Sequence, residues 1–172
     1  FRGQPADPVA TNPRKGLLVV LEGIDGSGKS TQMALLEQAL MQTHNVSCFR
    51  EPSDRSVLAN GYEAWEDDHL QVVEAVRAAL QRGDVVLVDR WRPYSGKAYQ
   101  GRPFRESDNK LQPDVVLWID LPVKEALKRA SDGDVFEAAD ADEWVKRRAA
   151  YKALCASHER WHRIDGGQTI AK

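Results

Sequence analysis

The segment LEGIDGSGKSTQ, residues 21–32, contains the spacing G-x-x-x-x-G-K-S. This spacing is typical of a phosphate-binding loop, in which backbone N–H groups surround a phosphate, the lysine reaches the β- and γ-phosphates and the hydroxyl ligates Mg²⁺. An apolar run precedes the loop and a helical pattern follows it, and a helix N-terminus adds the positive potential that such a site needs. We therefore expect Lys29 and Ser30 to bind nucleotide phosphates and the metal ion. The glycines that let the backbone approach a phosphate are Gly23, Gly26 and Gly28.

Short apolar runs alternate with helical patterns along the rest of the chain. The runs that predict strands are residues 16–22, 46–50, 84–90, 113–122 and 160–166. Apolar residues at helical spacing predict helices over residues 29–43, 65–83, 123–130 and 140–158. This alternation predicts an α/β fold of three layers, a parallel sheet with helices on both faces, and ligands bound at the carboxyl ends of the strands.

The helix expected at residues 65–83 is amphipathic. Arg82 and Gly83 form its stop signal, because a basic last turn followed by glycine is typical of a helix C-terminus. Its expected apolar face consists of Leu70, Val73, Val76 and Leu80.

The first fifteen residues differ from the rest of the chain. They contain three prolines and few apolar residues, without periodicity, and this composition predicts a disordered N-terminal tail over residues 1–15. By its length, the remainder, residues 16–172, is predicted to form a single domain.

Charge and composition exclude several classes of partner. The chain has 24 Lys+Arg and 26 Asp+Glu, a formal net charge of −2, so no nucleic-acid surface is expected. The longest apolar run, residues 17–21, is far shorter than a membrane span. Cys48 and Cys155 lie far apart and outside any C-x-x-C spacing, which predicts free thiols in a reducing compartment. We expect a soluble, cytoplasmic protein whose partners are small-molecule nucleotides.

Charged residues also end other predicted strands. Asp89 and Arg90 end the run at 84–90, where a carboxylate suits Mg²⁺ or its water shell and a guanidinium suits phosphate oxygens. Arg50 and Glu51 stand at the end of the second strand, and the proline after them favours an extended backbone that presents both side chains at the edge of the sheet.

Two further signals are weaker. Ser95, Tyr99 and Gln100 lie on a helical segment just downstream of the strand that ends in DR. Such residues usually serve packing or the surface, and only their position makes them candidates for substrate binding. Asp120 ends another strand, and the Leu-Pro pair after it favours a role in capping the next helix.

In order along the chain, LEGIDGSGKSTQ, REP, DRW with SGKAYQG, PDVVLWIDLPVKEALKR and DVFE resemble segments of thymidylate kinases, over roughly residues 16–165. The resemblance implies a P-loop kinase fold with a five-stranded parallel sheet, and ATP and Mg²⁺ as cosubstrates. It also implies transfer of the γ-phosphoryl group to a deoxynucleoside monophosphate, most simply dTMP, and often a homodimer.

The resemblance further implies roles for single residues. Lys29, Arg50 and Arg90 would be the catalytic cations, Asp25 would reach the 3′-hydroxyl of the acceptor sugar, and Tyr99 would crowd the 2′ position. The implied ATP-binding residues are Gly23, Gly26, Ser27, Gly28, Lys29, Ser30, Thr31 and Arg129. The implied substrate-binding residues are Asp25, Arg50, Glu51, Trp65, Arg90, Ser95, Tyr99 and Gln100, and the metal-binding residues are Ser30, Asp89 and Glu51.

The chain departs from the family pattern where the base is held. The family uses an aromatic residue followed by an arginine, whereas this chain has Trp65 and no arginine before His69. The polar position that contacts the base in the family is occupied here by Gly96.

A second departure concerns the lid, which is short and acidic here, with the sequence ASDGD. The phosphate loop has Gly26 and Ser27 where some relatives carry arginine. The missing cation would come from Arg129, Arg92, Arg102 or Arg105, or transfer would be slow. Two alternatives to a dTMP kinase therefore remain open: a deoxynucleoside kinase, and a nucleotide-binding protein with altered or lost transfer. A neutral nucleoside would give Arg50 no anion to hold.

Overall fold

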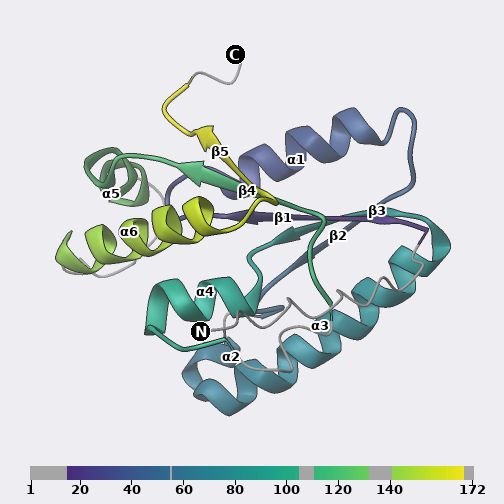
Figure 1. The fold of residues 1–172 in the computed structure, drawn as a ribbon, viewed down its shortest axis with the longest axis horizontal. Coiled ribbons are helices and arrows are strands. Elements are labelled where there is room, and N and C mark those ends of the chain that lie inside the picture. The colour runs from purple at the N-terminus through teal and green to yellow at the C-terminus, as the bar shows by residue number, and fades with distance from the viewer. Residues whose placement is uncertain (1–14, 55, 105–110, 132–140, 169–172) are drawn as a thin grey trace, which may run out of the picture.

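The computed structural model describes residues 15–54, 56–104, 111–131 and 141–168. One sheet of five parallel strands runs through the centre (Figure 1), in the order β2-β3-β1-β4-β5. The strands are β1 (Leu17–Glu22), β2 (Val46–Arg50), β3 (Val85–Asp89), β4 (Val115–Asp120) and β5 (Trp161–Asp165). The expected α/β fold with a five-stranded parallel sheet is confirmed.

Helices cover both faces of this sheet. Helix α1 lies on one face, and α3, α4 and α6 lie on the other, while α5 stands beside the end of β4 (Figure 1). The helices are α1 (Lys29–Leu40), α2 (Ser56–Ala59), α3 (Tyr62–Arg82), α4 (Arg92–Gln100), α5 (Val123–Ser131) and α6 (Ala141–Ser157). The short helix α2 has no counterpart among the sequence predictions. The predicted tail falls outside the described residues, except for Lys15.

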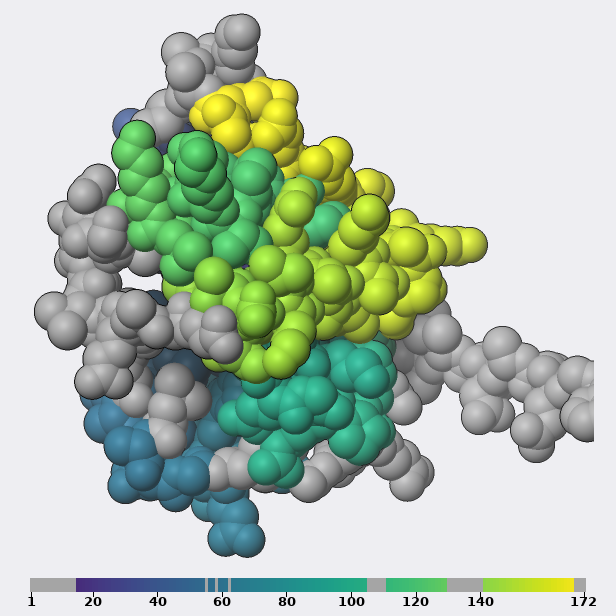
Figure 2. Space-filling model, turned by 90° about the vertical axis from the view of Figure 1, so that its left-hand side faces the viewer, coloured from purple at the N-terminus to yellow at the C-terminus, as the bar shows by residue number. Residues whose placement is uncertain are grey.

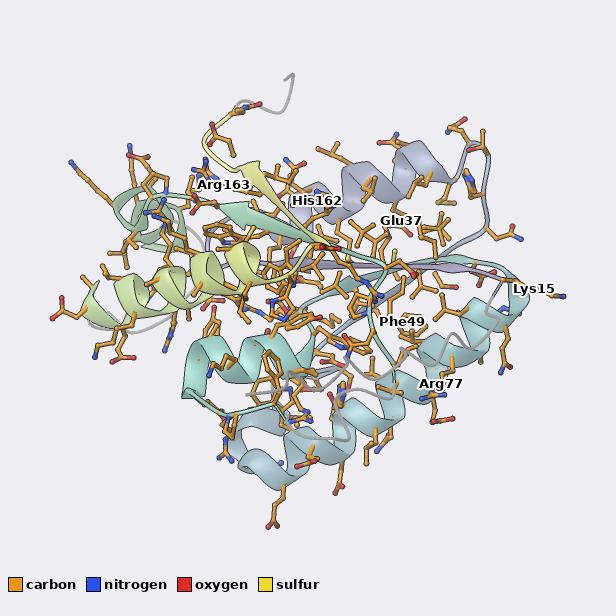
Figure 3. All side chains as sticks on the ribbon, in the orientation of Figure 1. Lys15, Glu37, Phe49, Arg77, His162 and Arg163 are labelled. Carbon is orange, nitrogen blue, oxygen red and sulfur yellow. The ribbon has the colours of Figure 1, made fainter. Side chains whose placement is uncertain are left out.

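The period of two along each strand divides the core between the two faces. Leu18 and Val20 of β1 belong to the larger cluster, beneath α3, α4 and α6. Val19, between them, belongs to a smaller cluster with Leu87, against the apolar side chains of α1. Figure 3 shows the side chains that fill both layers, with Phe49 on the side of α3. Glu22 continues the Leu18–Val20 period and therefore lies on the α4 and α6 side.

Helix α3 ends as predicted, and Val73, Val76 and Leu80 of its predicted apolar face are buried. Gly83 follows it in the left-handed conformation, with φ 93°. The prediction that Leu70 is buried is wrong, because this side chain is 49% exposed. Val72 is buried instead, next to Val73. The helix also begins three residues earlier than predicted, at Tyr62.

The register of the sheet brings the chemically interesting strand ends together. Leu21 in β1 and Arg50 in β2 both pair with Asp89 of β3. The phosphate loop therefore leaves β1 at the same edge at which Arg50, Asp89 and Arg90 are presented. This edge is the carboxyl end of the strands, where α/β proteins bind their ligands.

Candidate functional site

The phosphate loop connects β1 to α1 through glycines in conformations that other residues rarely adopt. Gly23, Gly26 and Gly28 have φ values of 147°, 71° and 96°. A Cβ atom at Gly26 would lie 2.5 Å from the carbonyl oxygen of Ala126 in α5, so a side chain there would separate the loop from α5. The turn thus favours glycine at all three positions, and close packing requires it at Gly23 and Gly26.

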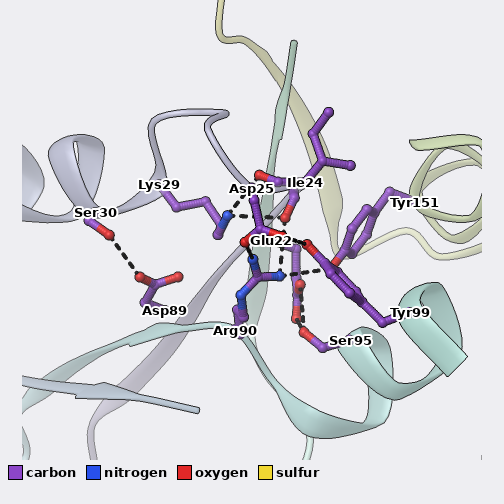
Figure 4. Close-up of polar contacts among 11 residues, drawn as sticks. Glu22, Ile24, Asp25, Lys29, Ser30, Asp89, Arg90, Ser95, Tyr99 and Tyr151 are labelled. Atoms are coloured by element: carbon purple, nitrogen blue, oxygen red, sulfur yellow. Dashed lines mark hydrogen bonds and ion pairs between the residues drawn. The ribbon is translucent and has the colours of Figure 1, made fainter. Parts of the chain in front are cut away.

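Lys29 begins α1 and is buried within the loop. Its ammonium group donates hydrogen bonds to the carbonyl oxygens of Gly23, at 3.1 Å, and Ile24, at 2.9 Å (Figure 4). Burial, and next the nearby Arg90 guanidinium, lower the pKa of Lys29 to about 8. The ammonium is thus a desolvated charge, which is worth more to an anion than a solvated one.

Ser30 and Asp89 form a pair suited to Mg²⁺. The Ser30 hydroxyl donates to Asp89 Oδ2 at 3.0 Å, and Asp89 Oδ1 is buried without a hydrogen-bond partner among the described residues. An unpartnered carboxylate oxygen beside a hydroxyl fits a hard cation that takes its other ligands from water and phosphate. No group of three acidic, histidine or cysteine side chains capable of holding a metal occurs in the described ranges, so such an ion would depend on the nucleotide for part of its coordination.

Arg90 follows β3 with φ 73°, a left-handed conformation that is rare for a residue other than glycine and is often found at functional sites. Its guanidinium is 2.5 Å from Asp25 Oδ1 and donates to the Gly23 carbonyl oxygen at 3.3 Å. Asp25 Oδ2 accepts a hydrogen bond from the Tyr99 hydroxyl at 3.0 Å. The loop, the end of β3 and α4 therefore meet at a single carboxylate (Figure 4).

The charge of Asp25 is stabilised by these neighbours. Burial alone would raise the pKa of this carboxyl, but Arg90 and then Lys29 lower it below its ordinary value, with smaller contributions from the Tyr99 hydroxyl and Arg147. Asp25 is therefore ionised at neutral pH. Arg90 and Lys29 stabilise its negative charge within a loop that otherwise favours anions.

These residues surround a cleft of about 360 Å³. Arg50, exposed at the end of β2, and Arg129, near the end of α5, contribute its other cations. Arg129 also donates to the Gly166 carbonyl oxygen at 3.2 Å. The lining residues are Asp25, Gly26, Gly28, Lys29, Ser30, Thr31, Arg50, Asp89, Arg90 and Arg129. The structure thus gathers most residues of the predicted ATP site and all the predicted catalytic cations.

Glu51, expected near the metal, lies elsewhere. It is 1% exposed, and its Oε1 lies 2.7 Å from His69 Nδ1. The backbone N–H of Arg92 donates to its other oxygen. Burial raises the pKa of Glu51 against the opposing effect of His69. In this structure Glu51 joins β2 to α3 and α4 and does not line the cleft.

The remaining predicted substrate contacts are also outside the cleft lining. Trp65 is 4% exposed, within the packing of α3. Ser95 is buried and donates to Glu22. Gln100 is exposed at the end of α4, where its side-chain oxygen accepts a hydrogen bond from Arg102 at 2.8 Å. Ser27, predicted with the ATP site, is 1% exposed beneath the loop.

Asp120 likewise has a different role from the capping role expected of it. Its buried carboxylate accepts two hydrogen bonds from Arg148, at 2.7 and 3.1 Å, and one from Arg163 at 2.7 Å. These residues border a second cavity of about 690 Å³, which is lined mainly by α6 together with Trp118 of β4. Figure 2 looks onto this face. The aspartate therefore ties α6 and β5 to β4 rather than capping α5.

Glu22 is a buried acid that sequence reasoning passed over. The Trp91 N–H donates to its Oε1 at 2.7 Å and the Ser95 hydroxyl to its Oε2 at 3.1 Å. Burial raises its pKa to about 7, although Arg90 opposes this effect. Trp91 directly follows Arg90, and Ser95 lies in the first part of α4, so Glu22 fixes the connection from Arg90 to α4. The signal was its place in the period of two after Leu18 and Val20.

Replacing Glu22 by Gln is expected to change how stability depends on pH. Because burial raises the folded-state pKa, the folded protein binds a proton that the unfolded chain releases, and stability is lost as pH rises from about 4.5 toward 7. Gln cannot ionise, so the free energy of unfolding of Glu22→Gln minus that of the wild type should increase by about 2 to 3 kcal/mol between pH 5 and pH 8. Urea denaturation at both pH values measures this difference; a constant difference would contradict the buried, protonated acid.

The first strand of the parallel sheet leads through a glycine loop into a helix. A lysine, a serine and a carboxylate from a neighbouring strand surround one cleft beside this loop. These features define a P-loop nucleotide-binding α/β protein. The thymidylate kinase family description matches residues 64–172. A probable thymidylate kinase of Natronomonas pharaonis is 36% identical over 184 aligned positions, which cover 89% of this chain and 91% of that protein. The chain belongs to the thymidylate kinase family.

Other relatives agree with this assignment. The thymidylate kinase of Desulforudis audaxviator is 34% identical, over 83% of this chain and 79% of the relative, and that of Gluconobacter oxydans is 33% identical, over 90% and 89%. The alignments span 175 and 193 positions, more than the 172 residues of this chain. The relatives therefore carry internal residues that this chain lacks. Among the helices that the structure describes, none has the length and apolar character needed to cross a membrane.

Proposed function

We propose that this protein transfers the γ-phosphoryl group of ATP to dTMP, giving ADP and dTDP. The observation that carries this proposal is the set of four cations, Lys29, Arg50, Arg90 and Arg129, that line one cleft with Asp25. Phosphoryl transfer requires two anions to be brought into line and the charge on the transferred group to be neutralised. The relatives named above are thymidylate kinases, which supports dTMP as the acceptor.

The cleft has two ends that suit two different nucleotides. At one end Lys29 and Ser30 stand at the N-terminus of α1, where the triphosphate of ATP binds. At the other end Arg50 and Arg90 offer planar guanidinium groups, which suit the oxygens of a monophosphate. Asp25 and Tyr99 lie beside this end, in a position to meet the deoxyribose. Mg²⁺ held by Ser30 and Asp89 would neutralise charge on the β- and γ-phosphate oxygens of ATP.

A product assay tests the proposal and its alternatives together. The protein is mixed with ATP, Mg²⁺ and each of dTMP, dUMP, dCMP, dAMP, dGMP and thymidine, and the products are separated by ion-exchange chromatography. We expect dTDP from dTMP and no product from thymidine, since Arg50 and Arg90 then have no anion to bind. Phosphorylation of thymidine would support the deoxynucleoside kinase instead. Binding of ATP without any transfer would support the nucleotide-binding protein that has lost the reaction.

The proposal includes the requirement for Mg²⁺ and the homodimer that the family resemblance implies, and the cytoplasmic location expected from the composition and the isolated cysteines. Removal of divalent ions with EDTA should abolish transfer, and excess Mg²⁺ should restore it. Sedimentation equilibrium measures the oligomeric state directly, and a monomer at all concentrations would contradict the homodimer alone.

A further inference from the structure

Four arginines were singled out from the sequence as sources of the missing cation, and the structure places them differently. Arg129 lines the cleft, but Arg92 is buried with its guanidinium 4.0 Å from Glu66. Arg102 bonds to Gln100 at the exposed end of α4, and Arg105 lies outside the described residues. Among the described residues, Arg129 is thus the one of the four that lines the cleft, and α6 carries a further arginine close to Asp25.

Helix α6 carries an arginine within its buried stripe. Trp144, Tyr151 and Leu154 are 2%, 0% and 5% exposed, and with Arg147 they recur at i, i+3, i+7 and i+10, which is one face of a helix. Tyr151 stands one turn beyond Arg147, and its hydroxyl lies 3.5 Å from Arg90 Nη1. The stripe therefore turns the Arg147 side chain toward the same site.

Arg147 contacts the group that holds Asp25. Its Cζ atom lies 4.4 Å from the centre of the Tyr99 ring, and that of Arg90 lies 4.8 Å from the same centre. The Tyr99 hydroxyl donates to Asp25. One aromatic ring thus carries two guanidinium groups, an arrangement in which the ring face attracts each cation.

The Arg147 guanidinium also has unused hydrogen-bonding capacity. Its Nε–H is buried and has no hydrogen-bond partner among the described residues. A buried, unpartnered donor of a charged group costs free energy, and an anion entering beside Asp25 would remove that cost. The Asp25 carboxylate, whose pKa the Arg147 charge lowers, is already paired with Arg90 at 2.5 Å, which leaves the Arg147 guanidinium available to such an anion.

We propose that Arg147 is a further catalytic residue, whose guanidinium binds the transferred phosphoryl group at the Asp25 side of the cleft. In the step it assists, an oxygen of the acceptor monophosphate bonds to the γ-phosphorus of ATP. The bond from that phosphorus to the bridging β-oxygen breaks, and its electron pair leaves with ADP. Arg147 thereby supplies charge that Gly26 and Ser27 of the loop cannot. This inference rests on the proposed function.

The test separates charge from packing. Arg147→Met keeps an apolar stem against Tyr99 but removes the charge, whereas Arg147→Lys keeps a charge without the fork. We expect kcat to fall by about 100-fold or more in Arg147→Met, and by less in Arg147→Lys. Lys152→Met, an exposed position on the same helix, is the matched control and should retain wild-type turnover.

Two readouts distinguish catalysis from a structural role. Guanidinium chloride at low millimolar concentration should partly restore kcat of Arg147→Ala, relative to the same concentration of sodium chloride. Arg147→Met should also bind ADP with aluminium fluoride and dTMP more weakly by about the factor lost in kcat, while its Kd values for ADP alone and dTMP alone stay within threefold of the wild type.

Each outcome decides the matter. A kcat within threefold of the wild type in Arg147→Met overturns the inference and leaves the proposed function standing. Equal losses in ground-state and transition-state-analogue binding overturn it as well, because they indicate a packing role. If the wild-type protein forms no diphosphate from any nucleotide, the proposed function fails, and the inference fails with it.

Discussion

Lys29→Met is expected to lower kcat by about 1000-fold, because it removes a preorganised charge at the point where the β- and γ-phosphates bind. The ammonium is buried and bonded to the Gly23 and Ile24 carbonyl oxygens, which fix its position in the loop. Lys124→Met, at an exposed position of α5, is the control and should retain full turnover. Steady-state kinetics with saturating dTMP measures the effect, and turnover within tenfold of the wild type would remove Lys29 from the mechanism.

The same lysine predicts how ATP affinity depends on pH. Burial and Arg90 lower its pKa to about 8, so Lys29 loses its proton as pH rises above that value. ATP binds the protonated form better, and its affinity should therefore fall by up to tenfold per pH unit above pH 8. Isothermal titration at pH 7 and pH 9 measures this fall. Lys29→Met should bind ATP weakly and show no such slope.

The arrangement of strands and helices could be predicted because the signals are local. Runs such as residues 84–90 read as buried strands, and the glycine after α3 ends that helix as expected. The phosphate loop was recognised from spacing alone, since backbone geometry and phosphate binding dictate its glycines. The same reasoning placed Val73, Val76 and Leu80 of α3 in the core correctly. It could not choose between Leu70 and Val72, because both are apolar and only tertiary packing decides which of them is buried.

The roles of single acids depended on partners that lie far away in the sequence. Glu51 stands at a strand end and looked available to a metal, but His69 of α3 pairs with it in the interior. Asp120 is a plausible cap by local pattern, yet Arg148 and Arg163 bind its carboxylate. Such pairings follow from how α3, α6 and β5 pack, and a single sequence does not specify these distances.

Two overlooked residues carried a readable signal. Glu22 interrupts a buried period of two, and Arg147 interrupts a buried helical stripe. A charged residue within an apolar pattern must find a partner, because an unpaired buried charge is costly. In this protein both residues face the turn around Arg90, where the loop, β3, α4 and α6 meet. A charged residue at a position where the pattern predicts an apolar one is thus a signal for the site, as is a charged residue at the end of a strand.

Arg90→Met is expected to lower kcat/KM for dTMP by about 1000-fold, the scale on which an arginine at a transferring phosphoryl group acts. The wild-type guanidinium binds Asp25 at 2.5 Å and the Gly23 carbonyl oxygen at 3.3 Å, so it also fixes the loop. Arg90→Lys should recover only part of the loss, because an ammonium lacks the planar fork that matches phosphate oxygens. Steady-state kinetics with varied dTMP and saturating ATP measures this loss of kcat/KM.

The loss should fall on the acceptor rather than on ATP. Lys29 and Ser30 lie at the donor end and keep their own contacts, so the Kd for ATP in Arg90→Met should remain within about threefold of the wild type. Arg82→Met, which removes an arginine at the far end of α3, where it pairs with Asp84, controls for a general loss of positive charge. An equal loss of ATP and dTMP affinity in Arg90→Met would contradict this division of the cleft. It would instead assign Arg90 to holding the loop through Asp25, with the acceptor phosphate bound by Arg50.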